Sequence, residues 1–282
     1  MNLARVFPRK TKQSPDDAKA FFGFPDIKTT PYFDAVDISV AFTYDIPKAE
    51  QMAERWRHHT ASVRMGGPAF GRPSVGEFEP GKYVKKGITF TSRGCPNKCW
   101  FCSVWKRETD GLRELAIKDG WVVGDDNLLA CSDGHIKSVF SMLHRQPQRP
   151  RFLGGLEARL LKDWHCEAMK TVKTEVMYFA YDTKDDLDPL RAAGELLPNY
   201  GFNWSSKKLM CYVLMGYKGD TIDAAHKRIE NTVRAGFWPL AMLWRGDKEE
   251  KEKTWLDFSR YWARPPLYFR EAQRIYWLQG LI

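Results

Sequence analysis

The chain has 282 residues, enough for one large domain or for a medium-sized domain with appendages. Its 43% hydrophobic and 28% charged residues are typical of a soluble globular protein. The first thirty residues contain no apolar run of the signal-peptide kind, and no apolar stretch reaches 18 residues. These features predict a cytoplasmic protein without a membrane partner.

Charge and cysteine content indicate the kind of partner. The net charge of +9 favours anionic partners such as nucleic acid, nucleotides or acidic lipids. Six cysteines in a chain of this length, without a secretory signal, are typical of reduced thiols or metal ligands. A disulfide framework is therefore not expected.

Residues 1–83 are predicted to form an N-terminal arm, a small β–α–β unit and a linker. Residues 1–30 mix charged residues, proline and glycine with little periodicity, which predicts an irregular arm. The apolar run 36–42 is typical of a strand, and Pro47 then stands where a helix with apolar residues at helical spacing begins. A second short strand follows and ends at two glycines. Residues 69–83 are rich in glycine and proline, which is typical of a linker.

Residues 84–245 alternate between strand and helix patterns. In the last helix, Asp220 or Thr221 is a suitable N-cap, and Gly236 is a suitable C-terminal stop. Alternating strands and helices form a parallel sheet. Six such units are fewer than the eight of a full barrel, so we predict an α/β fold with a partial (β/α)6 TIM-type barrel. The strand candidates are 87–92, 121–125, 151–157, 175–181, 208–215 and 238–243, and the helix candidates are 135–146, 160–172, 188–197 and 221–236.

Residues 246–282 are predicted to form an aromatic-rich helical C-terminal extension. The segment begins with the charged run 246–253, which is typical of a solvated helix face. We expect the aromatic side chains after this run to cap an open end of the barrel. They are Trp255, Phe258, Tyr261, Trp262, Tyr268, Phe269, Tyr276 and Trp277.

Three cysteines stand at the spacing C-x3-C-x2-C directly after the first strand candidate of the alternating region. Cys95, Cys99 and Cys102 lie among turn-forming residues, and such a loop can supply three thiolates to a 4Fe–4S cluster. The fourth iron then has no protein ligand, and a small molecule with an amine and a carboxylate can chelate it. Zinc is the main rival, but a closed zinc site takes four ligands, and no second C-x2-C pair follows at suitable spacing. A chance grouping of buried thiols is a further alternative.

The cysteine motif and its position resemble those of the radical S-adenosylmethionine (SAM) superfamily. The resemblance covers roughly residues 84–245, and its most specific part is the cysteine loop with Phe101 before the last cysteine. It implies that three motif cysteines hold a 4Fe–4S cluster and that SAM chelates the open iron. It also implies that the reduced cluster cleaves SAM to a 5′-deoxyadenosyl radical, which takes hydrogen from a substrate. The expected electron donor is flavodoxin- or ferredoxin-like.

Polar residues follow four of the predicted strands, where barrels of this kind carry their chemistry. The resemblance implies that some of them contact SAM. Arg159 suits the methionyl carboxylate through its fork geometry, and the turn at Gly216 resembles the family's turn near the ribose and adenine. An N-cap, a turn or a structural ion pair is the alternative for each. The candidate SAM-binding residues are Phe101, Asp125, Asp126, Asn127, Glu157, Arg159, Tyr181, Asp182 and Gly216.

No cobalamin cofactor is expected. The N-terminal β–α–β unit is similar to part of the cobalamin-binding module of many radical SAM enzymes. That module has a D-x-H-x-x-G motif upstream of the barrel, and this chain has none. The nearest string, 133–138, ends in serine and lies inside the predicted barrel.

Three further cysteines stand alone in apolar or helical surroundings. Cys131, Cys166 and Cys211 are expected to be core residues, because cysteine is among the most buried residue types. A catalytic, hydrogen-donating role is the alternative for Cys131, which follows the second strand candidate.

A basic stretch surrounds the cysteine motif. Between Pro80 and Arg107 there are seven lysines or arginines and no acidic residue. These cations either balance an anionic cluster and the SAM carboxylate or bind phosphates of a substrate. We expect a nucleotide or nucleic-acid base as substrate, as in phage-type DNA hypermodification. One alternative is an enzyme that modifies a peptide or small metabolite. The other is a non-catalytic iron–sulfur module that binds nucleic acid. The phosphate-binding candidates are Lys82, Lys85, Lys86, Lys106 and Arg107.

Overall fold

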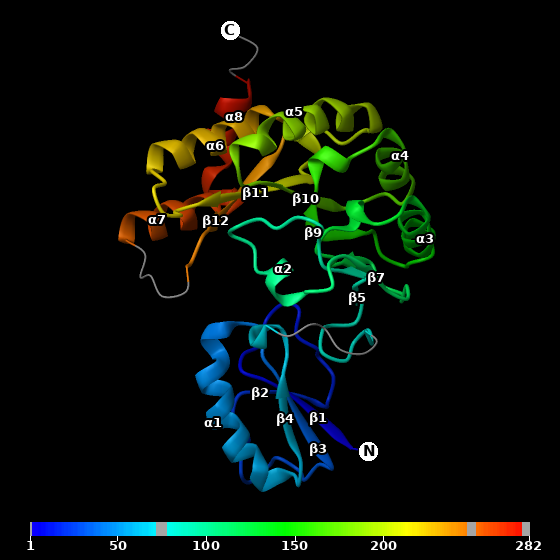
Figure 1. The fold of residues 1–282 in the computed structure, drawn as a ribbon, viewed down its shortest axis with the longest axis vertical. Helices are drawn as coiled ribbons and strands as arrows, with labels where there is room; N and C mark the ends of the chain where they lie inside the picture. Colours follow the sequence, from blue (N-terminus) through cyan, green and yellow to red (C-terminus); the bar gives the residue numbers. More distant parts are fainter. Residues whose placement is uncertain (1, 72–77, 247–251, 278–282) are drawn as a thin grey trace. The chain divides into compact units, whose positions relative to one another are not determined.

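A computed structural model of the chain describes residues 2–71, 78–246 and 252–277 (Figure 1). Residues 1–120 form one unit and residues 121–282 form the other. The predicted boundaries after residues 83 and 245 stay predictions. Among the described residues, no helix is both long and apolar enough to span a membrane.

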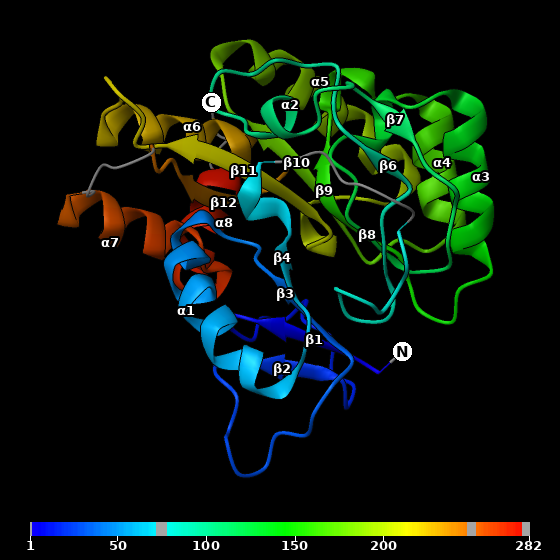
Figure 2. The same cartoon turned by 60° about the horizontal axis from the view of Figure 1, so that its bottom comes forward.

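The first unit contains a four-stranded parallel sheet covered by one helix. Its elements are β1 (Leu3–Phe7), β2 (Ala20–Phe22), β3 (Ala35–Ser39), α1 (Ile46–Trp56) and β4 (Val63–Gly66). The strand order is β2-β1-β3-β4. Helix α1 lies beside the sheet (Figure 2), and its Met52 and Trp56 pack with Val6 and Ile38 into one core. The predicted β–α–β unit is confirmed as β3, α1 and β4.

The structure corrects the prediction of an irregular arm over residues 1–30, because β1 and β2 lie there. The charged Arg5 in the middle of β1 hides the strand from a search for apolar periodicity. Its buried guanidinium forms an ion pair with Asp17 and donates to the carbonyl oxygens of Gly81 and Lys82 at 3.1 and 2.7 Å. These partners satisfy the buried charge, which makes arginine acceptable in the strand.

The rest of the first unit consists of short elements joined by loops. The predicted linker begins within a 3-10 helix, Pro68–Phe70, and its residues 72–77 lie outside the described residues. The remaining elements are β5 (Ile88–Thr89), β6 (Ser92–Arg93), α2 (Val104–Arg107) and β7 (Arg113–Glu114). Strands β6 and β7 pair antiparallel.

The second unit alternates strands and helices, as the sequence predicts. Its strands are β8 (Val122–Val123), β9 (Arg151–Leu156), β10 (Val176–Tyr181), β11 (Leu209–Met215) and β12 (Trp238–Leu243). They lie in one sheet in the order β12-β11-β10-β9-β8, and neighbouring strands pair parallel. The predicted α/β class is therefore confirmed. Closure into a partial (β/α)6 barrel stays a prediction.

Four helices connect the strands of this sheet and lie along its outer side in Figure 1. They are α3 (Asp133–His144), α4 (Asp163–Thr171), α5 (Leu187–Leu196) and α6 (Ile222–Arg234). Thr221 is the N-cap of α6, since its hydroxyl accepts the N–H of Ala224 at 3.2 Å, and Gly236 follows the helix with φ +90°.

The C-terminal extension is helical where the structure describes it. Its helices are α7 (Lys253–Trp262) and α8 (Pro265–Trp277). Trp262 and Tyr268 are buried in one core with Val213 of β11 and Ile229 of α6. Residues 247–251 of the predicted charged helix face lie outside the described residues. The extension therefore packs on the last strands through its aromatic side chains, and capping of a barrel end stays a prediction.

Candidate functional site

The motif cysteines lie on a loop, residues 94–112, that the β6–β7 pair closes at its base. At the start of the loop Gly94 has φ +83°, and a Cβ there would stand 1.9 Å from the carbonyl oxygen of Gly111. Only glycine fits this contact. Further along, the buried carboxylate of Glu108 accepts a hydrogen bond from Arg113 at 2.7 Å. These contacts fix how the loop folds back on itself.

The three thiols are each half-buried. The N–H of Cys102 donates to the carbonyl oxygen of Cys99 at 3.1 Å, and the Trp105 indole donates to the same oxygen at 2.8 Å. The N–H of Val104 donates to Sγ of Cys102 at 3.4 Å. This contact and the two to the Cys99 carbonyl oxygen hold the end of the cysteine motif in a tight turn.

The chemistry of this donor set fits a 4Fe–4S cluster. Three thiols on one short loop match the three ligands that such a cluster needs when a small molecule takes the fourth iron. None of the six cysteines, all of which are described, forms a disulfide. Within the described residues, no three His, Cys, Asp or Glu side chains are gathered so as to hold a single metal ion. Cluster ligands bind separate irons, so this finding concerns a site for a single metal ion and does not test a cluster.

Phe101, the aromatic residue before the last motif cysteine, is half-buried. Its ring packs edge to face against Trp100, with centroids 5.4 Å apart and an interplanar angle of 88°. The indole of Trp100 is about half exposed at 52%. The loop therefore presents one aromatic surface to solvent beside its thiols.

The predicted phosphate-binding cations differ in their ion pairing. Lys86 and Lys106 are exposed, and the ammonium of Lys106 lies 5.5 Å from the ring centroid of Trp105. The other three lie beside carboxylates, which reduce their attraction for phosphate. They are Lys82 with Glu79 at 2.9 Å, Lys85 with Asp16 at 2.9 Å and Arg107 with Glu108 at 3.7 Å.

In the second unit, polar side chains from successive strand ends form one connected network. Asn127, after β8, donates to Glu157 at 2.7 Å. Arg159 lies 3.2 Å from the other Glu157 oxygen and 3.1 Å from Asp186, which follows β10. The structure therefore brings together three of the predicted SAM-binding residues, because the carboxyl ends of parallel strands share one edge of a sheet.

Asp186 is a part of this network that the sequence analysis missed. Its Oδ2 accepts the backbone N–H groups of Asp182 and Thr183 at 3.1 and 2.8 Å, and also the Thr183 hydroxyl. The T-x-x-D spacing directly after a strand is the capping signal that could have revealed it. Burial, with the negative charge of Asp186 in support, raises the pKa of Asp182 to about 7. Tyr181, the last residue of β10, is buried.

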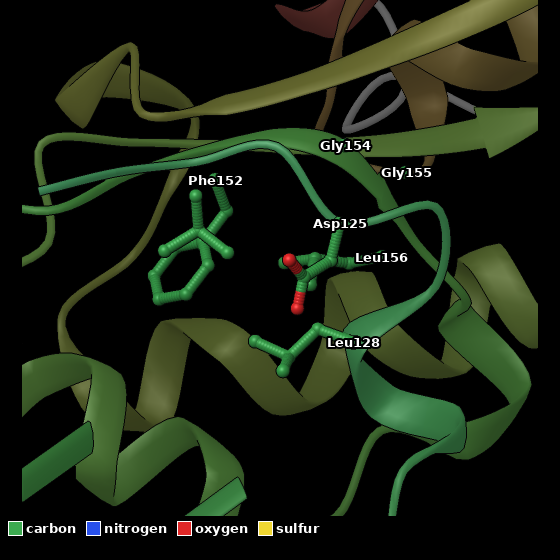
Figure 3. A pocket seen from close by; sticks show the side chains of 7 residues that line it. Asp125, Leu128, Phe152, Gly154, Gly155 and Leu156 are labelled. Atoms are coloured by element: carbon green, nitrogen blue, oxygen red, sulfur yellow. The ribbon is translucent and has the colours of Figure 1, made fainter. Parts of the chain in front are cut away.

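Asp125 lies in a small pocket of the second unit, where Leu128, Phe152 and Leu156 surround its side chain (Figure 3). A Cβ on Gly154 would stand 1.7 Å from the Asp125 carbonyl oxygen, so this glycine lets β8 and β9 approach closely. Asp125 as a whole is only 2% exposed, so its carboxylate lies away from solvent.

Further predicted residues of this unit are Asp126 and the three single cysteines. Asp126 is half-buried. Cys131 is buried and ends a 3-10 helix, Leu128–Ala130, where its N–H donates to Leu128 at 3.1 Å. Cys166 and Cys211 are buried as well, in keeping with core positions.

The turn at Gly216 after β11 is held by an ion pair. Gly216 has φ +71°, and its N–H donates to Asp220 at 2.8 Å. Arg228 of α6 binds the same carboxylate oxygen at 2.5 Å and donates to the carbonyl oxygen of Leu214 at 3.2 Å. Asp220 thus anchors the turn, while Thr221 caps the helix.

Two comparisons with known proteins gave no match. No protein-family model matches the chain, and no curated protein matches it. The resemblance stated above therefore depends on the residues of the cysteine loop and of the strand ends themselves.

Proposed function

We propose that the chain is a radical SAM enzyme that modifies a nucleotide or a nucleic-acid base. One observation carries this proposal: Cys95, Cys99 and Cys102 are half-buried on one loop that a glycine contact and a buried ion pair hold in shape. When bound, a 4Fe–4S cluster would supply the electron that cleaves SAM, and the resulting 5′-deoxyadenosyl radical would remove hydrogen from the substrate.

The strand-end network supports a role in binding SAM. Arg159 is about half exposed, so its guanidinium can bind the methionyl carboxylate in a bidentate manner. Glu157 and Asp186 hold that guanidinium in place, at 3.2 and 3.1 Å. In barrels of this kind, ligand contacts lie at the carboxyl ends of the strands. The proposal therefore includes a partial (β/α)6 barrel.

The positive charge of the chain supports the proposed substrate class. The chain carries a net charge of +9, and Lys86 and Lys106 are exposed within the stretch around the cysteine loop. Anionic substrates are attracted to such a surface. A nucleotide or nucleic-acid base meets this condition, whereas a neutral peptide or metabolite does not.

The test is reductive cleavage of SAM by the anaerobically reconstituted chain. With dithionite and SAM, the parent protein should form 5′-deoxyadenosine, and the variant with all three motif cysteines replaced by alanine should form none. Cys166→Ala is the matched control, because it removes a buried thiol far from the loop in sequence, and it should behave like the parent. A parent protein that carries iron and sulfide yet leaves SAM intact would contradict the proposal.

A further inference from the structure

The carboxyl edge of the four-stranded sheet in the first unit has the topology of a ligand-binding edge. The strand order is β2-β1-β3-β4. The chain therefore runs from β1 to its neighbour β2 at one edge of the sheet, and from β3 to its neighbour β4 at the other edge. Ligands of open α/β sheets bind at such a switch point, outside the carboxyl ends of the two strands. Residues 8–19 follow β1 here, and residues 40–45 follow β3.

Two aromatic rings lie exposed on the loop after β3. Phe42 and Tyr44 are stacked, with centroids 5.2 Å apart and an interplanar angle of 6°, yet they are 41% and 60% exposed. The Arg9 guanidinium, from the loop after β1, lies 4.9 Å from the centroid of the Tyr44 ring. Arg9 is itself fixed by two contacts to the buried carboxylate of Asp45, one of them at 2.7 Å. The chain therefore holds a flat surface in place before any ligand arrives.

Three exposed lysines lie at this edge: Lys10 and Lys12 belong to the loop after β1, and Lys48 belongs to the first turn of α1, directly after the loop that follows β3. Lys48 donates to the carbonyl oxygen of Pro8 at 2.6 Å and so joins α1 to the loop after β1, and the ammonium of Lys10 lies 5.4 Å from the ring centroid of Phe22. Lys12, two residues after Lys10 in the loop that follows β1, is also exposed. Within the described residues, no carboxylate lies in ion-pair range of these three ammonium groups. Their charge is therefore available to phosphates.

We propose that this edge binds single-stranded nucleic acid. A base stacks on the Phe42 and Tyr44 rings, and phosphates on either side of it meet Lys10, Lys12 and Lys48. Stacking on exposed aromatic rings combined with lysines along the backbone is how single strands are bound without sequence preference. Three cations spread over the loop after β1 and the first turn of α1 suit successive phosphates of a strand, whereas a mononucleotide has only one phosphate group to offer them. This binding requires neither the cluster nor SAM, so it goes beyond the proposed function.

The first test removes the rings from the reconstituted full chain. Binding of a fluorescein-labelled dT12 strand is followed by fluorescence anisotropy. The double variant Phe42→Leu, Tyr44→Leu keeps apolar side chains and should bind at least about tenfold more weakly, given the usual loss per unstacked base. Tyr32→Leu is the matched control, because Tyr32 is 64% exposed and lies before β3, at the opposite end of the strand, and it should bind like the parent. Equal affinity of parent and double variant would overturn the proposal.

The second test addresses the phosphates. Replacing Lys10, Lys12 and Lys48 by glutamine should reduce the slope of log K against log salt by about 2, since each phosphate contact on a single strand contributes about 0.7. Lys28→Gln, an exposed lysine elsewhere in the unit, should leave the slope unchanged. Free dTMP should compete far more weakly than dT12. Equal competition would overturn a strand-binding role in favour of a mononucleotide site.

These outcomes are separate from the proposed function. Both variants should cleave SAM like the parent when no nucleic acid is present, because neither changes the cysteine loop or the strand-end network. Loss of dT12 binding with SAM cleavage intact supports the inference. Loss of both activities in the double variant would contradict it, since the rings would then serve the fold of the chain rather than a ligand.

Discussion

The partly buried carboxyl of Asp182 makes the stability of the fold depend on pH. Burial and the neighbouring Asp186 raise its pKa from 3.8 to about 7. Between these two values the folded chain holds a proton that the unfolded chain has lost, so the free energy of unfolding falls as the pH rises. Since a pKa difference of 1 corresponds to about 1.4 kcal/mol, the full loss amounts to about 4 kcal/mol and is complete above pH 7.

Asp182→Asn removes this dependence. The amide stays neutral at all pH values, and its oxygen can still accept the N–H of Leu214, which now hydrogen-bonds to the carboxyl. At pH 8 the variant should be more stable than the parent by up to about 4 kcal/mol, a rise in melting temperature on the order of 10 °C. At pH 4 the two should melt together.

Thermal unfolding followed by circular dichroism at pH 4, 6 and 8 measures the effect. Asp185→Asn is the matched control, because Asp185 lies in the same turn but is exposed, and it should show no gain at pH 8. If the parent and the Asp182→Asn variant have parallel pH profiles, Asp182 does not hold a proton in the folded chain near neutral pH.

Two further substitutions test the two halves of the candidate site. Gly94→Ala places a Cβ 1.9 Å from the Gly111 carbonyl oxygen, so it should deform the loop and lower iron and sulfide content at least several-fold, whereas Gly134→Ala, with open space around it, should not. Normal iron content in Gly94→Ala would show that the loop shape is irrelevant. Arg159→Met should weaken SAM binding about tenfold or more in equilibrium dialysis while leaving iron content unchanged, and the exposed Arg191→Met should bind like the parent. Unchanged SAM affinity in Arg159→Met would remove that residue from the site.

The strands of the second unit could be predicted because their signals are local. β10 and β11 are apolar runs of six and seven residues. Thr183 caps the short helix after β10, and Thr221 caps α6 after β11, so each strand is followed by a helix-start signal. β1 carries no such signal, because Arg5 interrupts it and the partners of Arg5 stand 12 to 77 residues away. Contacts of that range depend on the tertiary fold.

The candidate site shows the same division. The meeting of Asn127, Glu157 and Arg159 was predictable, since side chains at the carboxyl ends of neighbouring parallel strands lie close together. The pairing of Lys85 with Asp16 was not, because 69 residues separate them. The positive charge near the cysteine loop is therefore smaller than the basic stretch of sequence predicts, because a carboxylate from a distant part of the sequence lies beside one of its cations.

The central claim is that the C-x3-C-x2-C loop holds a 4Fe–4S cluster, and metal analysis of the anaerobically reconstituted chain tests it most directly. Iron, acid-labile sulfide and zinc are measured for the parent and for the variant with Cys95, Cys99 and Cys102 replaced by alanine. We predict about four irons and four sulfides per parent chain and neither in the variant. One zinc per chain without sulfide would contradict the account.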